Sequence, residues 1–288
     1  QHMARHLLGR TRKYNPDSFC PDMLWQYLSH DLDSEWWRMC SARWDQIKVP
    51  VYTVGNWGGW GLHLRGNTEA YLCAVSKHKK LRIKLEIRTG GSKKPYAFRY
   101  ENEWPLARTQ WTKMYFSIEK ERSPDESHSE GHLVPHEVTT ARKISYSGSN
   151  PNKAGVGSGS SAPGIGRSGV SFVTDPMAQD TEITGPLMAN LWVSSTAEDM
   201  DIMVTLRNID PDGNEVFELG QQGQPVVLTK GWLRASHRKL DSQKSLPYRP
   251  YHAHNERLWL EPNVPVECQI EIISTCIVLK KGHQLRVD

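Results

Sequence analysis

Hydrophobic and polar residues alternate most regularly in the second half of the chain. Two such runs cover residues 187–194 and 202–207, and a third covers residues 266–273. A period of two is the pattern of a β-strand with one face on a core. The second run ends in Asp210-Pro211-Asp212-Gly213, where proline presets φ and glycine accepts positive φ, so a tight reversal should follow. We therefore predict an antiparallel β-sandwich in which the first two runs are neighbouring strands.

The first third of the chain has a different pattern. Between residues 7 and 45, apolar and aromatic residues recur at spacings of three and four, which predicts helices with one buried face. Asp31, Asp33 and Glu35 form an acidic helix start, and we favour capping over metal binding for them. The β-branched run at 47–54 predicts a buried parallel strand, followed by a glycine-rich turn and a helix. That arrangement places ligands at the carboxyl ends of strands.

Several short motifs, in a fixed order, resemble a known family. They are Asp180-Thr-Glu-Ile-Thr-Gly-Pro186, Leu191-Trp-Val-Ser-Ser195, Asp199-Met-Asp201, Asp210-Pro-Asp-Gly213, Gly231-Trp-Leu-Arg-Ala-Ser-His-Arg238 and Lys281-Gly-His-Gln-Leu-Arg286. This region closely resembles the C-terminal jelly-roll domain of the cocaine-esterase (CocE/NonD) and X-Pro dipeptidyl-peptidase family of serine hydrolases, in a fungal-type form. A weaker resemblance to the family's catalytic α/β-hydrolase domain covers residues 7–83.

This resemblance implies a mainly β chain with two parts. Residues 1–84 would be a partial α/β-hydrolase domain that keeps cap helices and a late core strand. Residues 85–288 would be a jelly-roll β-sandwich with a flexible insertion at about residues 119–169. In hydrolases of the family, helices like those before residue 45 cover the active site and help to shape the acyl pocket.

The turn after the predicted parallel strand matches a part of the family that lies near the catalytic site. Leu62-His63 and Arg65-Gly66 fit the family's Leu-His-x-Arg-Gly pattern, but the usual position of the triad acid holds Gly58 and Gly59. Asp45 and Glu69 are the nearest substitute acids. Trp57, Trp60 and His63 are candidates for lining the substrate pocket, and core packing remains open for the two tryptophans.

Two catalytic elements of the family have no counterpart in the sequence. No Gly-x-Ser-x-Gly nucleophile elbow occurs. The strand at 80–83 runs directly into the one at 85–91, where the family inserts the loop that holds the catalytic histidine. We expect the catalytic Ser and His to lie outside this chain, which would then be a fragment of a larger enzyme and inactive alone.

The resemblance implies that the parent protein is a serine hydrolase that cleaves an ester or amide, an acyl or dipeptidyl substrate, through an acyl-enzyme. An acyltransferase of the same family is one alternative. A non-catalytic β-sandwich binding module is another, if the chain functions as given. The expected partner is a small-molecule ester or amide. The resemblance implies no cofactor, and a homo-oligomer remains open.

The composition limits the class of protein and its compartment only broadly. Hydrophobic residues make up 38% and charged residues 24%, as in ordinary globular proteins, and the net charge is +4. The basic cluster Lys77-His-Lys-Lys80 fits a solvated helix end better than a nucleic-acid site, because no aromatic platform accompanies it in the sequence. Five cysteines without paired spacing favour a reducing compartment, hence the cytoplasm, and no apolar run is long enough to span a membrane.

Four further patterns imitate functional sites. We assign His128, His132 and His136 to a loop, and likewise His252 and His254, rather than to metal sites. Glu101 and Glu103 read as a turn with solvated charges, not as a glycosidase pair. Gly164-Ile-Gly-Arg-Ser-Gly169 has the spacing of a dinucleotide loop but reads as linker, since no strand precedes it.

Overall fold

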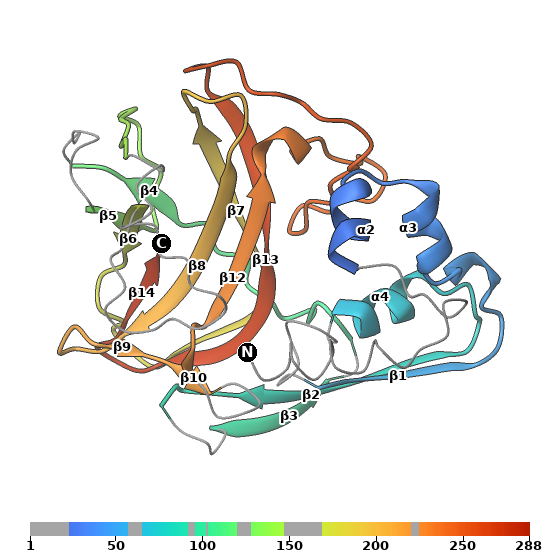
Figure 1. Cartoon of the computed structure of the whole chain (residues 1–288). Coiled ribbons are helices and arrows are strands. Elements are labelled where there is room, and N and C mark those ends of the chain that lie inside the picture. Colours follow the sequence, from blue (N-terminus) through green and yellow to red (C-terminus); the bar gives the residue numbers. More distant parts are fainter. Residues whose placement is uncertain are drawn as a thin grey trace, which may run out of the picture. The chain divides into compact units, whose positions relative to one another are not determined.

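A computed structural model of the chain describes residues 23–56, 65–91, 96–101, 103–119, 128–146, 169–219 and 225–288. The chain forms two compact units. A helical unit takes in the chain up to Ala42 together with Ala253–Glu256. A larger β-rich unit comprises Arg43–His252 and Arg257–Asp288 (Figure 1).

Two short helices form the described part of the helical unit, α2 (Met23–Ser29) and α3 (Glu35–Cys40). Their aromatic rings stack on one another, with Tyr27 on Trp37 and His30 on Trp36. The predicted buried helix face is wrong for the described residues, because α3 has no buried residue and Met39 is 73% exposed. Helical spacing shows which residues share a face, but it does not show whether another element covers that face.

The acidic segment before α3 begins the helix as expected, since Glu35 is its first residue. The helix follows Ser34, which makes no side-chain capping bond, and Asp33 lies 3.6 Å from the guanidinium of Arg38. The N-cap residue Ser34 therefore contributes no side-chain capping bond, while Glu35 supplies the expected carboxylate in the first turn.

A parallel β-α-β segment opens the β-rich unit. It contains a 3₁₀ turn η3 (Trp44–Gln46), strand β1 (Val51–Asn56), helix α4 (Arg65–Cys73) and strand β2 (Lys79–Ile87). β1 pairs in parallel with β2, and β2 pairs with the antiparallel strand β3 (Ala97–Glu101). α4 packs on one face of β1 and β2. The parallel strand predicted at 47–54 is confirmed, but only one face of β1 is buried, because Tyr52 is 54% and Val54 is 56% exposed.

The remaining strands build one large curled sheet, which forms the jelly roll in the upper left of Figure 1. Its strands are β4 (Tyr115–Ser117), β5 (His128–Val134), β6 (Gly169–Val173), β7 (Thr181–Val193), β8 (Asp201–Ile209), β9 (Glu215–Val216), β12 (Thr229–Arg234), β13 (Val266–Leu279) and β14 (Gln284–Val287). Their order is β4-β5-β6-β14-β8-β12-β13-β7, with β9 beside β8. A small separate ladder joins β10 (Glu218–Leu219) to β11 (Pro225–Val226), and the turn η6 (Ala235–His237) follows β12.

The mainly β architecture expected from the sequence is confirmed, but the expected pairing of the first two strands is wrong. β7 pairs with β13, and β8 pairs with β12 and β14. Alternation shows which residues of a strand face the core, whereas the partner of that strand depends on how later segments fold back.

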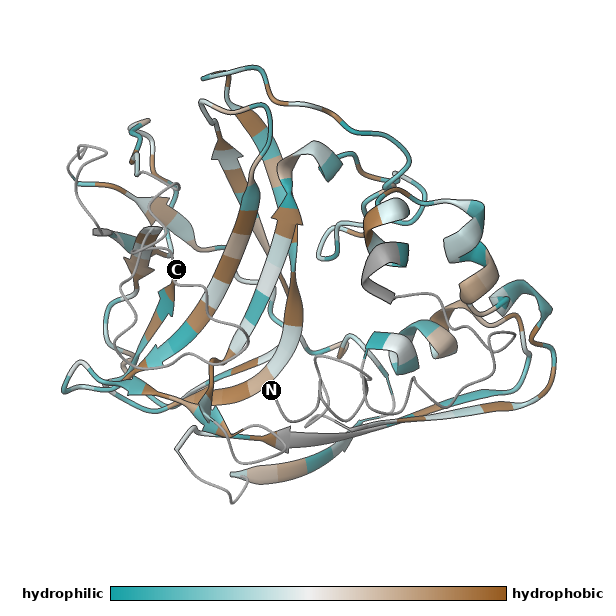
Figure 2. Cartoon of the chain, in the orientation of Figure 1, coloured by the Kyte–Doolittle hydropathy of each residue, from teal (hydrophilic) through white to brown (hydrophobic). Residues whose placement is uncertain are grey.

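The main core lies inside this curled sheet. Val204, Leu206 and Ile270 point inward, while Met203 and Trp192 are exposed on the outer face, as the alternation predicts. Figure 2 shows hydrophobic and hydrophilic residues mixed along these long strands. A second, smaller cluster joins Ile87 of β2 to Cys276 and Val278 of β13.

Three local expectations are corrected. His128–Val134 is strand β5 rather than loop, because it pairs with β4 and, in parallel, with β6. Lys79 and Lys80 begin β2 rather than end a helix. Glu101 is not a solvated turn residue, since it ends β3 and forms ion pairs with Arg99 and Arg108.

Candidate functional site

The turn predicted to approach the substrate lies between the carboxyl end of β1 and the first residue of α4. Trp57, Trp60 and His63 fall outside the described residues, so their role stays a prediction. What the structure describes are the two elements that hold the ends of this turn. Since β1 and β2 are parallel, the turn starts at the strand end where ligands bind in α/β proteins.

Asp45 lies at the opposite end of the same segment. Asp45 belongs to η3, which precedes β1. The carbonyl of the neighbouring Trp44 accepts a hydrogen bond of 3.2 Å from the N–H of Val75, which lies two residues after α4. On the surface, the carboxylate of Asp45 accepts two hydrogen bonds of 3.3 Å each from the side chain of Arg43. The bond from Arg43 lowers the pKa of Asp45 below its usual value. The substitute-acid role of Asp45 remains untested.

Glu69 lies on α4, one to two helical turns beyond the end of the predicted glycine-rich loop. Its Oε1 accepts a hydrogen bond of 2.6 Å from Nη1 of Arg249, and the thiol of Cys73 lies 3.5 Å from its Oε2. Both charged side chains are largely covered, with 20% and 18% exposure. Burial, followed by the charge of Glu69, raises the pKa of the Cys73 thiol. Glu69 is thus already engaged by a cation, and its role as an acid in a triad remains a prediction.

A second ion pair lies beside the first. Nη1 of Arg65, the first residue of α4, is 2.7 Å from Oε2 of Glu271 on β13. Burial raises the pKa of Glu271, while the charges of Arg65 and Arg249 act in the other direction. We call Arg65, Glu69, Arg249 and Glu271 the α4 charge cluster. Its two ion pairs hold α4 to the jelly-roll side of the unit and so fix the position at which the turn ends.

Sequence reasoning missed half of this cluster. Arg249 and Glu271 are about 180 or more residues from their partners along the chain. Glu271 alternates with buried residues of β13, so its position predicts an outward-facing charge, and nothing local indicates that a helix covers it.

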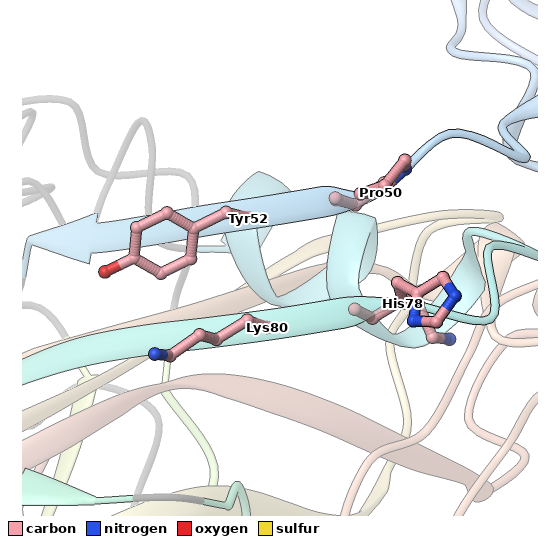
Figure 3. Close-up of a pocket in the computed structure, with 6 residues that line it drawn as sticks. Pro50, Tyr52, His78 and Lys80 are labelled. Atoms are coloured by element: carbon pink, nitrogen blue, oxygen red, sulfur yellow. The ribbon is translucent and has the colours of Figure 1, made fainter.

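Two surface hollows lie away from the carboxyl end of β1. One, of about 380 Å³, is lined by Pro50, Val51, Tyr52, His78, Lys79 and Lys80 at the start of β1 and β2 (Figure 3). The other, of about 440 Å³, belongs to the helical unit and is lined by Tyr27, His30, Asp31, Leu32, Asp33, Trp37 and His254. The second hollow is formed by part of the segment to which the family resemblance assigns cap helices, and that assignment stays a prediction.

The described part of the chain contains no cluster of three or more His, Cys, Asp or Glu side chains suited to a metal ion. His132 lies 3.4 Å from Glu119, and His252 contacts the carbonyl oxygen of Gln269 at 3.0 Å. None of the helices described is long and apolar enough to cross a membrane.

Comparison with protein families gives a match over most of the chain. The model of the X-Pro dipeptidyl-peptidase C-terminal non-catalytic domain matches residues 77–288. The chain belongs to this family. Proteins of two mycobacteria, Mycobacterium bovis and Mycobacterium tuberculosis, both provisionally named serine esterases, are 24% identical over 218 residues. That alignment covers 68% of this chain but only 32% of theirs.

Solved structures share the fold. A CocE/NonD family hydrolase from Staphylococcus aureus superposes with a TM-score of 0.74 and 24% identity, covering 92% of this chain and 50% of that one. An aminopeptidase from a marine sediment archaeon, Thaumarchaeota archaeon, gives a TM-score of 0.56 with 14% identity, covering 92% and 52%. The likeness extends beyond residues 77–288 into the preceding segment. The chain spans about half the length of these structures and about a third of the curated relatives.

Proposed function

We propose that this chain forms the non-catalytic β-domain, together with part of the adjoining α/β domain, of a serine hydrolase that cleaves an ester or amide through an acyl-enzyme. The observation that carries the proposal is the family match over residues 77–288, with fold likeness to a CocE/NonD hydrolase over 92% of the chain. The parallel β1-α4-β2 segment supports it, because it has the arrangement expected of the end of an α/β-hydrolase sheet.

In this proposal the chain contributes positioning rather than the nucleophile. Trp57, Trp60 and His63 line the substrate pocket, and the α4 charge cluster holds the helix that follows them. Any Ser nucleophile and catalytic His belong to parts of the enzyme that this sequence does not contain. Asp45 and Glu69 remain the two carboxylates proposed to orient that His.

The first test is chemical labelling of the 288-residue polypeptide. We expect no hydrolysis of p-nitrophenyl esters and no labelling by a fluorophosphonate probe. A serine of this chain labelled stoichiometrically would refute the assignment of the nucleophile outside it. Sequencing the transcript upstream of Gln1 and across Ile83 to Leu85 should then reveal the nucleophile elbow and the histidine loop.

The second test concerns the acid and uses the full enzyme that carries this sequence. Removing a triad acid typically lowers catalysis by about 10⁴-fold. A loss of that size in kcat/KM for Glu69→Gln or Asp45→Asn would identify the substitute acid. Wild-type values for both variants would place the orienting group elsewhere.

A non-catalytic binding module is the second candidate, because the matching family model describes a non-catalytic domain. It predicts that the chain occurs in cells at its present length and that the transcript holds no further hydrolase segment. Detection of the chain only as part of a longer, probe-reactive polypeptide would exclude this alternative.

A further inference from the structure

The first half of α4 has no apolar side chain. It reads Arg-Gly-Asn-Thr-Glu over residues 65–69, and the apolar residues of the helix come after it. Hydrophobic packing therefore cannot fix where this half lies, whatever other segments surround it. Arg65 does not favour the helix itself either, because a cation at the first residue opposes the helix dipole. The charges of this half therefore need an explanation outside the helix.

These charges face two opposite charges of the β-domain. Nη1 of Arg65 lies 2.7 Å from Oε2 of Glu271, and Oε1 of Glu69 accepts a hydrogen bond of 2.6 Å from Nη1 of Arg249. The side chains of Glu271, Glu69 and Arg249 are 23%, 20% and 18% exposed, so three of the four charges are largely withdrawn from solvent. Burial raises the pKa of Glu271, Arg65 and Arg249 lower it, and Glu69 adds to the rise. All four members of the α4 charge cluster thus act on one another.

The order of these charges favours a single alignment of α4 on the β-domain. Arg65 and Glu69 are one helical turn apart, about 6 Å along the axis. A shift of the helix by one turn would bring Glu69 opposite Glu271, and the reverse shift would bring Arg65 opposite Arg249. Each shift replaces an ion pair with two like charges in a poorly solvated place. Repulsion of this kind is a common source of specificity between protein surfaces.

We propose that Arg249 and Glu271 are positioning residues, which specify the register of α4 and so the place at which the predicted substrate turn ends. The link is covalent, because His63 precedes Arg65 by only two residues. The β-domain then sets the substrate affinity of the enzyme through α4, without touching the substrate. The effect on substrate rests on the proposed hydrolase function, whereas the register of α4 does not.

An exchange of charges separates register from simple anchoring. In the variant Arg65→Glu with Glu271→Arg, both pairs stay attractive in the native alignment, but they are also attractive after a shift of one turn. We therefore expect two sets of amide signals, or exchange broadening, for α4 in NMR spectra of the 288-residue chain. Adding Glu69→Arg and Arg249→Glu reverses all four charges and again favours one alignment, so a single set of signals should return.

The matched control exchanges an exposed ion pair of the jelly roll. Asp201 on β8 and Arg234 on β12 meet at 2.8 Å with 55% and 54% exposure. Asp201→Arg with Arg234→Glu should leave one set of α4 signals. A single set in the variant Arg65→Glu with Glu271→Arg would overturn the proposed register. Two sets after reversal of all four charges would overturn it as well.

Kinetics of the full enzyme that carries this sequence test the effect on substrate. The exchange at Arg65 and Glu271 should raise KM at least about tenfold and change kcat less than about threefold, because it displaces a binding element rather than the reacting groups. Arg65→Lys keeps the charge and should retain most of the wild-type affinity, and the exchange at Asp201 and Arg234 should change neither constant. An unchanged KM would overturn the positioning role. A wild-type enzyme that hydrolyses no ester or amide would instead refute the proposed function, and the NMR spectra would still decide the register.

Discussion

Gly231 illustrates why a family motif needs a particular residue. A Cβ atom added there would lie 2.3 Å from the carbonyl oxygen of Glu271 on the neighbouring strand β13. Backbone cannot move aside as a flexible side chain can, so only glycine allows β12 and β13 to approach this closely. The sequence identifies the Gly-Trp-Leu-Arg motif, but the reason for its glycine appears only once the partner strand is known.

We predict that Gly231→Ala lowers the free energy of unfolding by about 1–3 kcal/mol, as other overpacked sites do. Gly66, on α4, is the matched control because its added Cβ would meet no atom within 4 Å apart from its chain neighbours and its own helix backbone. Gly66→Ala should raise stability by up to about 1 kcal/mol, since alanine favours helix. Urea denaturation measures both, and equal losses in the two variants would contradict the explanation.

The carboxylates of Glu271 and Glu182 should make the free energy of unfolding change with pH in opposite directions. Burial raises the pKa of Glu271, so ionising it costs stability as pH rises from the ordinary glutamate range toward its folded pKa. Burial also acts to raise the pKa of Glu182, but hydrogen bonds from Arg99 and Thr184 outweigh it and leave this pKa lowered. The ionised form of Glu182 therefore stabilises the fold at pH values above the ordinary pKa range of glutamate. This contribution is lost as pH falls toward the lowered pKa of the folded state.

Denaturation of Glu271→Gln and Glu182→Gln between about pH 4 and 7 tests these signs. Relative to the wild type, Glu271→Gln should become more stable as pH rises, and Glu182→Gln less stable. Parallel pH profiles for the three proteins would show that neither carboxylate has a shifted pKa.

At the level of elements, the sequence predicts strand faces better than strand partners. The alternation of Val204 and Leu206 with Met203 correctly assigns the two faces of β8. β8 lies between β12 and β14 rather than beside β7, because the sheet order is set by long-range returns of the chain. For the same reason half of the α4 charge cluster was missed, since Arg249 and Glu271 lie about 180 or more positions from their partners on α4.

A double-mutant cycle on Glu69 and Arg249 should show how strongly α4 is held. Both side chains are largely covered, and they meet at 2.6 Å, so we predict a coupling free energy of about 0.5–3 kcal/mol. Glu69→Gln, Arg249→Gln and the double variant supply the cycle. The surface pair Arg43 and Asp45 is the control and should show a smaller, salt-sensitive coupling. Equal coupling in the two cycles would mean that the cluster does not anchor the helix.

For the whole molecule, the sequence motifs predicted the jelly roll, and the family match confirms it. Trp57, Trp60 and His63 could be named as pocket candidates only through resemblance, because a glycine-rich turn has no periodic pattern that would fix its geometry. The domain boundary proposed between residues 84 and 85 falls inside β2, which continues from Lys79 to Ile87. One strand of a single three-stranded sheet therefore crosses the proposed boundary: its first half pairs with β1 and its second half with β3.

The continuity of β2 across this boundary leads to a prediction about where the β-domain can be cut. Leu81, in the first half of β2, packs against the cluster of Ile87, Cys276 and Val278. A polypeptide that starts at residue 77, where the family match begins, keeps this contact, whereas one that starts at residue 85 loses it. We therefore expect residues 85–288 to have a lower Tm than residues 77–288. Replacing Leu81 with Ala in the longer polypeptide should reproduce part of the loss, because a partly buried leucine contributes roughly 1–3 kcal/mol. Equal Tm values for the two lengths would show that the first half of β2 contributes nothing to the jelly roll, and the boundary at residue 85 would then be correct.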